Sequence, residues 1–173
     1  SFKVLQSYGN IMIPSESGEL ASGLSGLGRL AEPETIVKFI ENDILSQLPL
    51  KNKTVLITAG PTYEQIDPVR FIGNYSSGKM GFEIAKAASS LGAEVILVSG
   101  PSHETIDGYC IKRIDVSSSD EMYDKVHQFY SKCNIAILSA AVADFKPQNK
   151  ASEKIKKRDA ELEIRLEPTT DIL

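Results

Sequence analysis

The run Thr54-Val55-Leu56-Ile57-Thr58 is short, almost wholly apolar and rich in β-branched residues. Such a run is typical of a strand that is buried on both faces of a sheet. Residues 95–98 and 134–139 form two further runs of this kind, and residues 111–116 form a more polar one. We therefore expect these four segments to be strands.

Helical segments separate these runs. Residues 79–91 predict one helix, with Gly92 as its C-cap, and residues 119–130 predict another, with Ser119 as its candidate N-cap. This alternation predicts the α/β class, with a doubly wound, mainly parallel, Rossmann-like sheet and helices on both faces. Ligands of such sheets bind beyond the carboxyl ends of the strands. The segments there are Gly60 onward, Ser99-Gly100 and residues 140–144.

The first fifty residues have a different character. Glycine loses much backbone entropy on folding, so we expect no regular elements at Ser15-Glu16-Ser17-Gly18 or at residues 23–28. A helix is expected to begin at Pro33, which suits a first turn, and to end before Pro49. Its apolar residues recur at helical spacing: Ile36, Phe39, Ile40, Ile44 and Leu48. A boundary near residue 50 therefore divides a tail and linker helix (1–50) from the main domain (51–173).

The composition excludes several classes of function. With 42% hydrophobic and 24% charged residues, 173 residues suffice for one full soluble domain. A net charge of −4 argues against a general nucleic-acid or membrane-surface role. Cys110 and Cys133 are far apart and lack metal-ligand spacing, so we expect reduced core residues. No signal peptide or membrane-spanning run is evident, and we expect a cytoplasmic protein.

The segment Gly73-Asn74-Tyr75-Ser76-Ser77-Gly78-Lys79-Met80-Gly81 leads into the first helix of the main domain. The free N–H groups of a helix N-terminus suit a phosphate, and Gly78 and Gly81 would permit its close approach. An ordinary cap with small packing residues is an equal alternative. The P-loop spacing GxxxxGK[ST] nearly fits, but Met80 stands where a hydroxyl would hold Mg²⁺, and no GxGxxG follows the first strand.

Two further segments carry candidate ligand groups. Ala140-Ala141-Val142-Ala143-Asp144 follows a strand and combines small residues with one carboxylate, although Asp144 could simply cap the next element. The basic residues Lys150, Lys154, Lys156, Lys157 and Arg158 could form a mobile loop that closes over a triphosphate, or a solvated face. We expect all three segments to converge on an anionic ligand at one sheet edge.

These residues resemble the phosphopantothenate–cysteine ligase family of coenzyme A biosynthesis. The resemblance runs from about Lys53 to the last residue. Its blocks are Thr58-Ala59-Gly60-Pro61-Thr62, Asp67-Pro68-Val69-Arg70-Phe71-Ile72, residues 74–81, residues 140–144 and Glu153-Lys154-Ile155-Lys156-Lys157. The resemblance implies that CTP activates 4′-phosphopantothenate as an acyl-cytidylate, with release of pyrophosphate. The amine of cysteine then attacks the acyl group and gives 4′-phosphopantothenoylcysteine.

The resemblance also implies roles for individual residues. Asn74 and Lys154 would be catalytic, and Lys154 would stabilise charge around the α-phosphate from a flexible flap. Arg70 would reach a substrate in the neighbouring subunit of a homodimer. Further substrate contacts would come from Asn74, Ala140, Ala141 and Asp144. Nucleotide contacts would come from Gly60, Ser76, Gly78, Gly81, Ser139, Asp144, Lys154, Thr170 and Asp171. Mg²⁺ would accompany the triphosphate without a dedicated protein cage.

The first fifty residues resemble the end of a phosphopantothenoylcysteine decarboxylase, on Gly18-Glu19-Leu20-Ala21-Ser22-Gly23 and Gly26-Leu27-Gly28-Arg29-Leu30. Ser22 stands where many members have a proton-donating cysteine, and a hydroxyl is a far weaker acid than a thiol. We therefore interpret this segment as the tail of a preceding domain in a bacterial bifunctional protein. FMN would belong to the decarboxylase body, which the chain lacks. The pattern of the family continues beyond Leu173, so the chain alone could be inactive.

Two other functional classes stay open. One is a NAD(P)-binding Rossmann-type module, against which the missing GxGxxG argues. The other is an inactive binding or dimerisation fragment. The choice between CTP and ATP is also open, because the residues that would read the base are expected after Leu173.

Overall fold

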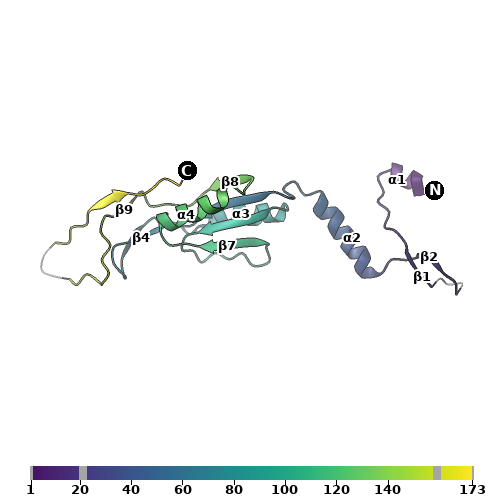
Figure 1. Ribbon diagram of the computed structural model, residues 1–173, viewed down its shortest axis with the longest axis horizontal. Coiled ribbons are helices and arrows are strands. Elements are labelled where there is room, and N and C mark those ends of the chain that lie inside the picture. Colours follow the sequence, from purple (N-terminus) through teal and green to yellow (C-terminus); the bar gives the residue numbers. More distant parts are fainter. Residues whose placement is uncertain (1, 20–22, 158–160, 173) are drawn as a thin grey trace. The chain divides into compact units, whose positions relative to one another are not determined.

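The computed structural model describes residues 2–19, 23–157 and 161–172 (Figure 1). The chain divides into two compact units, Ser1–Leu48 and Pro49–Leu173. The larger unit contains the expected strands and helices. Among the described residues no helix is long and apolar enough to cross a membrane.

The core of the larger unit is a four-stranded parallel sheet with the order β7-β6-β3-β8. The strands are β3 (Thr54–Ala59), β6 (Glu94–Ser99), β7 (Ile111–Asp115) and β8 (Ile135–Leu138). All four match the runs that the sequence predicted, so the α/β, Rossmann-like prediction is confirmed. The strand β3 lies between β6 and β8, which explains why its residues from Val55 to Ala59 are buried.

Successive residues of β3 face opposite sides of the sheet, and each side packs against one helix. Val55 and Ile57 belong to a cluster with Phe82 and Ala85 of α3 (Lys79–Ser90). Leu56 belongs to a second cluster, with Met122 and Val126 of α4 (Ser119–Tyr130). A strand exposes alternate side chains to opposite faces, so a continuous apolar run requires a cover on both. The helices supply that cover, as predicted.

The ends of the two helices differ slightly from the expectation. The N-cap of α4 is Ser118, whose side chain accepts a hydrogen bond from the backbone N–H of Glu121; Ser119 is already inside the helix. Serine is a good cap at either position, so sequence could not distinguish them. The C-cap of α3 is Leu91, and Gly92 follows it with a φ of 91°. This left-handed backbone is the usual reason for a glycine after a helix.

Short strands replace the long loop that we expected between β3 and α3. The strands β4 (Tyr63–Gln65) and β5 (Phe71–Gly73) form an antiparallel pair. The rings of Tyr63 and Phe71 stack across it, with centroids 3.9 Å apart. A second pair joins β9 (Phe145–Pro147) to β10 (Leu166–Pro168). Three-residue strands give too little periodicity to be recognised in a sequence.

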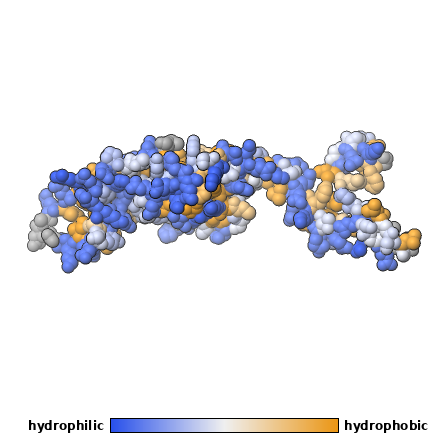
Figure 2. Space-filling model, viewed as in Figure 1, coloured by the Kyte–Doolittle hydropathy of each residue, from blue (hydrophilic) through white to orange (hydrophobic). Residues whose placement is uncertain are grey.

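The smaller unit contains the expected helix α2 (Pro33–Ser46), with Pro33 in its first turn. The expectation of no regular elements before it was wrong. The strands β1 (Glu16–Glu19) and β2 (Ser25–Arg29) form an antiparallel hairpin, and α1 (Phe2–Ser7) is helical. The ladder uses only backbone groups, so it tolerates the glycines that made it hard to predict. Hydrophobic side chains remain at the surface of this unit (Figure 2).

The cysteines are only partly as expected. Cys133 is half-buried and packs against the cluster on the α4 side. Cys110 is exposed, because it lies in the turn before β7 and not in the strand itself. The expectation of two core cysteines was therefore wrong for Cys110.

Candidate functional site

The segments that follow β3 and β8 run side by side beyond the carboxyl edge of the sheet. The N–H of Ala141 donates to the carbonyl oxygen of Gly60 at 2.8 Å, and the N–H of Thr62 donates to the carbonyl oxygen of Ala141 at 3.3 Å. An isolated parallel bridge joins Pro61 to Ala141. Two of the predicted segments are thus fixed to each other, since their strands are neighbours.

Threonine hydroxyls reinforce this junction. The hydroxyl of Thr58 accepts from the N–H groups of Ser139 (3.1 Å) and Ala140 (3.2 Å). The hydroxyl of Ser139 donates to the carbonyl oxygen of Thr58 at 2.6 Å. The hydroxyl of Thr62 accepts from the N–H of Ala143 at 2.9 Å. Buried backbone groups need such partners, so the path of residues 139–143 depends on two threonines.

Asn74 joins a third segment to this junction. Its side-chain amide donates to the carbonyl oxygens of Val142, at 2.9 Å, and Ala141, at 3.4 Å. Asn74 follows β5 and precedes α3, so the amide bridges the approach to the helix and the loop after β8. The structure therefore brings together Asn74, Ala140 and Ala141.

The N-terminus of α3 begins at Gly78, whose φ is 82°. The hydroxyls of Ser76 and Ser77 accept from the N–H groups of Gly78 (3.2 Å) and Lys79 (3.3 Å). The first helical bond is donated by Phe82 to the carbonyl oxygen of Gly78. The N–H groups of Met80 and Gly81 lie before that bond, in the turn where helices have spare donors. The serines thus cap part of the terminus themselves.

The two glycines of this segment are packing positions. A Cβ at Gly81 would lie 2.5 Å from Cβ of Ala59 and 2.7 Å from the hydroxyl oxygen of Ser139. A Cβ at Gly78 would lie 3.0 Å from the backbone nitrogen of Gly60. The open side of each glycine is therefore filled by the sheet and its loops, not left open for a phosphate. For Gly81 the packing alternative explains the residue.

A cavity of about 310 Å³ lies beside the loop after β8; we call it the first cavity. Thr169 fixes its far wall, because its hydroxyl donates to the carbonyl oxygen of Ala143 (2.7 Å) and its N–H to that of Asp144 (2.9 Å). The lining residues are Thr58, Leu138, Ala140, Val142, Ala143, Asp144, Thr169, Thr170, Asp171 and Ile172.

Arg70 and Lys154 line a different cavity, of about 1340 Å³, which we call the second cavity. The linings of the two cavities share no residue. The charged residues of the second cavity are mostly basic: Lys156 and Lys157 lie next to Lys154 in its wall, and Glu153 and Glu161 are the acidic members. The structure thus does not bring Lys154 to the first cavity, contrary to the expected convergence of all three segments on one site.

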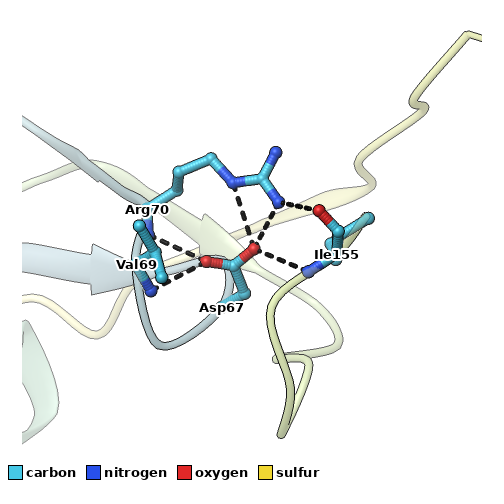
Figure 3. Close-up of polar contacts among 4 residues, drawn as sticks. All are labelled: Asp67, Val69, Arg70 and Ile155. Carbon is cyan, nitrogen blue, oxygen red and sulfur yellow. Dashed lines mark hydrogen bonds and ion pairs between the residues drawn. The ribbon is translucent and has the colours of Figure 1, made fainter. Parts of the chain in front are cut away.

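A buried carboxylate connects the walls of the second cavity. Asp67 is almost inaccessible, and its side chain contacts Arg70 and the backbone of Val69 and Ile155 (Figure 3). The Arg70 guanidinium holds the pKa of the Asp67 carboxyl well below its usual range, with help from the backbone N–H donors, while burial acts in the opposite direction. Arg70 was expected to reach out to a substrate, but here it is paired within the chain.

The remaining predicted residues fall into two groups. Gly60, Ser76, Gly78, Gly81 and Ser139 surround the strand ends near Asn74, while Thr170 and Asp171 line the first cavity with Asp144. Ser22 and Arg158 lie outside the described residues. Within residues 2–19, 23–157 and 161–172, no three His, Cys, Asp or Glu side chains cluster closely enough to hold a metal ion.

Sequence reasoning gave no role to several residues that shape the site. The loop after β8 is fixed by Thr58, Thr62 and Thr169. Asp67 fixes residues 150–157, which we call the basic segment, through the N–H of Ile155. A hydroxyl residue at the end of an apolar strand is a usable signal for Thr58. The others bond to residues more than 20 positions away, which only the fold reveals.

Comparison with known proteins adds independent information. A family model described as the DNA/pantothenate metabolism flavoprotein C-terminal domain matches residues 50–173. Over 173 residues the chain is 50% identical to a cysteine/cysteine sulfinic acid decarboxylase from an unknown prokaryotic organism, covering 98% of this chain and 48% of that protein. Over 175 residues it is 45% identical to the coenzyme A biosynthesis bifunctional protein CoaBC of Bacillus subtilis (strain 168), covering 100% of this chain and 43% of that protein.

A solved structure is similar as well. The crystal structure of the C-terminal domain of a CoaBC protein aligns with a TM-score of 0.62 at 44% identity, covering 73% of this chain and 58% of that one. The chain spans about half the length of the curated relatives it matches.

Proposed function

Because this chain belongs to the family of the DNA/pantothenate metabolism flavoprotein C-terminal domain, we propose that it is the ligase part of a phosphopantothenate–cysteine ligase. The observation that carries the proposal is the 44% identity to a solved CoaBC C-terminal domain, together with the loops that meet at the carboxyl edge of the sheet. CTP activates the carboxylate of 4′-phosphopantothenate, which forms an acyl-cytidylate and releases pyrophosphate. The amine of cysteine then attacks the acyl carbon and displaces CMP.

Positioning and charge stabilisation carry such a reaction. The nucleotide binds to backbone groups along Gly60, Ser76, Gly78 and Gly81, at the start of α3 and not in the filled space beside the two glycines. It also binds along Ser139, Asp144, Thr170 and Asp171. The acyl group lies near Asn74, Ala140 and Ala141. The fixed bonds of Asn74 to the loop after β8 support this arrangement, since they hold the reacting segments at constant separation.

The second cavity supplies the remaining positive charge. Lys154 stabilises the α-phosphate, at which the anhydride breaks. Arg70 binds the phosphate of a substrate; in a homodimer this is the substrate bound by the neighbouring subunit. Because the two cavities have separate linings, the side chain of Lys154 has to reach from the second cavity towards the nucleotide during the reaction.

Mg²⁺ fits the residues of the first cavity. Mg²⁺ commonly binds through one or two carboxylates together with substrate phosphates, and Asp144 lines that cavity. The ion would neutralise charge on the triphosphate. FMN would belong to the other half of a bifunctional protein, for which residues 1–50 would be the connecting tail.

Calorimetric titration of the chain with CTP, ATP and NADPH in the presence of Mg²⁺ tests the nucleotide. We expect binding of CTP and release of pyrophosphate when phosphopantothenate and cysteine are added. Binding of NADPH without CTP would identify a dinucleotide module instead. Binding of CTP without turnover would identify an inactive binding fragment.

One relative is named as a decarboxylase of cysteine and cysteine sulfinic acid, so decarboxylation needs its own assay. Release of carbon dioxide from cysteine or its sulfinic acid, in the absence of CTP, is not expected from the ligase part. Such release, with no CTP-dependent pyrophosphate, would overturn the proposal.

A further inference from the structure

Asp67 uses both oxygens of its carboxylate, and each oxygen has a different task. Oδ1 accepts from the N–H groups of Val69 and Arg70, both at 2.8 Å, and so closes the turn between β4 and β5. Oδ2 accepts from Nε of Arg70 at 3.0 Å and from the N–H of Ile155 at 3.1 Å. One oxygen therefore shapes its own turn, while the other reaches a segment 88 residues away.

The basic segment is held at several points. Nη2 of Arg70 contacts Asp67 and also donates to the carbonyl oxygen of Ile155 at 2.7 Å, so both backbone groups of Ile155 are bonded (Figure 3). The N–H of Ala151 donates to the carbonyl oxygen of Ile66 at 3.0 Å. Ile155 directly follows Lys154, so these bonds set where the backbone of Lys154 lies.

Part of the Arg70 guanidinium remains accessible to a ligand. Its side chain is 40% exposed although Asp67 is fully buried, and its remaining terminal nitrogen points away from Asp67 (Figure 3). A guanidinium can bind a carboxylate on one edge and an oxyanion on another, because its five donors lie in one plane. Arg70 can therefore contact a phosphate in the second cavity without leaving Asp67.

We infer that Asp67 is a positioning residue: its Oδ2 holds the backbone next to Lys154 against Arg70 and so fixes the point from which the Lys154 side chain reaches a phosphate-bearing ligand. The inference rests on the proposed function for the identity of that ligand. The bonds that join Asp67, Arg70 and Ile155, which we call the latch, are a property of the chain alone. Asp67 does not touch the ligand. Its carboxylate sets where the backbone beside Lys154 lies relative to Arg70.

The variant Asp67→Asn separates the two tasks of the carboxylate. Asparagine retains one oxygen for the turn at Val69 and Arg70, but its amide nitrogen cannot accept from Arg70 or Ile155. Glu83→Gln is the matched control, because it removes one carboxylate paired at i,i+3 with a cation, Lys86, on the surface of α3. If Asp67→Asn fails to fold, Arg70→Gln removes the guanidinium and the bond to Ile155 while leaving Asp67 in place.

Limited trypsin digestion of the whole chain reads out the latch, because the segment contains its own cleavage sites at Lys154, Lys156 and Lys157. We expect cleavage there to become about tenfold faster in Asp67→Asn, as in local opening after loss of charge-assisted bonds. Cleavage of Glu83→Gln should match that of the parent chain, and mass spectrometry assigns each cut. Equal rates at these lysines in Asp67→Asn and the parent chain would overturn the inference.

Ligase kinetics distinguish this outcome from failure of the proposed function. In Asp67→Asn we expect kcat to fall about tenfold, because Lys154 is no longer held in place. The KM for CTP should change by less than about threefold, because loss of these bonds affects nucleotide binding less than the placement of Lys154. A fall in kcat equal to that of Glu83→Gln would contradict the positioning role. A parent chain that neither binds CTP nor shows ligase turnover would instead refute the proposed function, and the digestion result would still stand.

Discussion

The side-chain amide of Asn74 donates to the carbonyl oxygen of Val142 at 2.9 Å, across 68 residues of sequence. This bond joins the approach to α3 with the loop after β8. The two segments that carry most of the candidate nucleotide contacts are therefore one structural unit. Asn74 holds that unit together besides any contact that it makes with an acyl group.

Asn74→Asp should impair both structure and turnover. A carboxylate has no proton to donate to the carbonyl oxygens of Ala141 and Val142, and it repels a nearby phosphate. We expect a loss of about 1 kcal/mol in the free energy of unfolding, and a fall in turnover of about tenfold or more. Urea unfolding and pyrophosphate release measure the two effects.

Asn134→Ala is a suitable control for that experiment. Asn134 also joins two segments, since its side-chain oxygen accepts from the N–H of Thr54 at 2.9 Å, but at the opposite end of β3. Its loss should lower stability without affecting turnover. Full activity of Asn74→Asp would count against the role of Asn74.

Lys154→Gln should separate binding from chemistry. If Lys154 stabilises charge that develops at the α-phosphate, its loss should reduce kcat about a hundredfold, while the Kd for CTP changes much less. Lys125→Gln, on the surface of α4, controls for the loss of one positive charge. Unchanged turnover in Lys154→Gln would remove this residue from the mechanism.

Gly81→Ala should destabilise the fold by about 1–3 kcal/mol, as expected for an added methyl group in a filled space. The new Cβ would meet Ala59 at 2.5 Å. Adding Ala59→Gly removes that neighbour, so the double variant should lose less stability than the sum of the two single variants. Unfolding free energies equal to that of the parent chain would show that Gly81 has no packing role and would restore the phosphate-approach explanation.

The stability of the chain should depend on Asp67 at low pH. Arg70 lowers the pKa of Asp67 in the folded state below its unfolded value, so the ionised carboxylate stabilises the fold at neutral pH. This contribution is lost as the pH falls through the folded pKa. The stability difference between the parent chain and Asp67→Asn should shrink progressively between about pH 5 and pH 2. Urea unfolding of both proteins at several pH values measures this difference. A stability difference that grows on acidification would contradict a lowered pKa of Asp67 in the folded state.

Several features of this protein follow from the sequence alone. The apolar runs at Thr54–Ala59 and Glu94–Ser99 can be satisfied only by burial on both faces, and the helices α3 and α4 supply that cover. Parallel connections then place the following loops at one edge, so the position of Asn74 and of residues 140–144 could be anticipated. These inferences succeed because they depend on local periodicity and on a general rule of sheet topology.

The tertiary structure decided what the loops do with their polar groups. The bonds of Asp67 to Ile155 and of Thr62 to Ala143 span more than 80 residues, and no spacing rule predicts them. The same holds for Gly81, whose missing Cβ makes room for Ala59 and Ser139. Sequence determined the sheet and its functional edge because burial acts on patterns. Only the fold could show that Arg70 and Lys154 line a second cavity, because individual hydrogen bonds depend on the distance between atoms far apart in the chain.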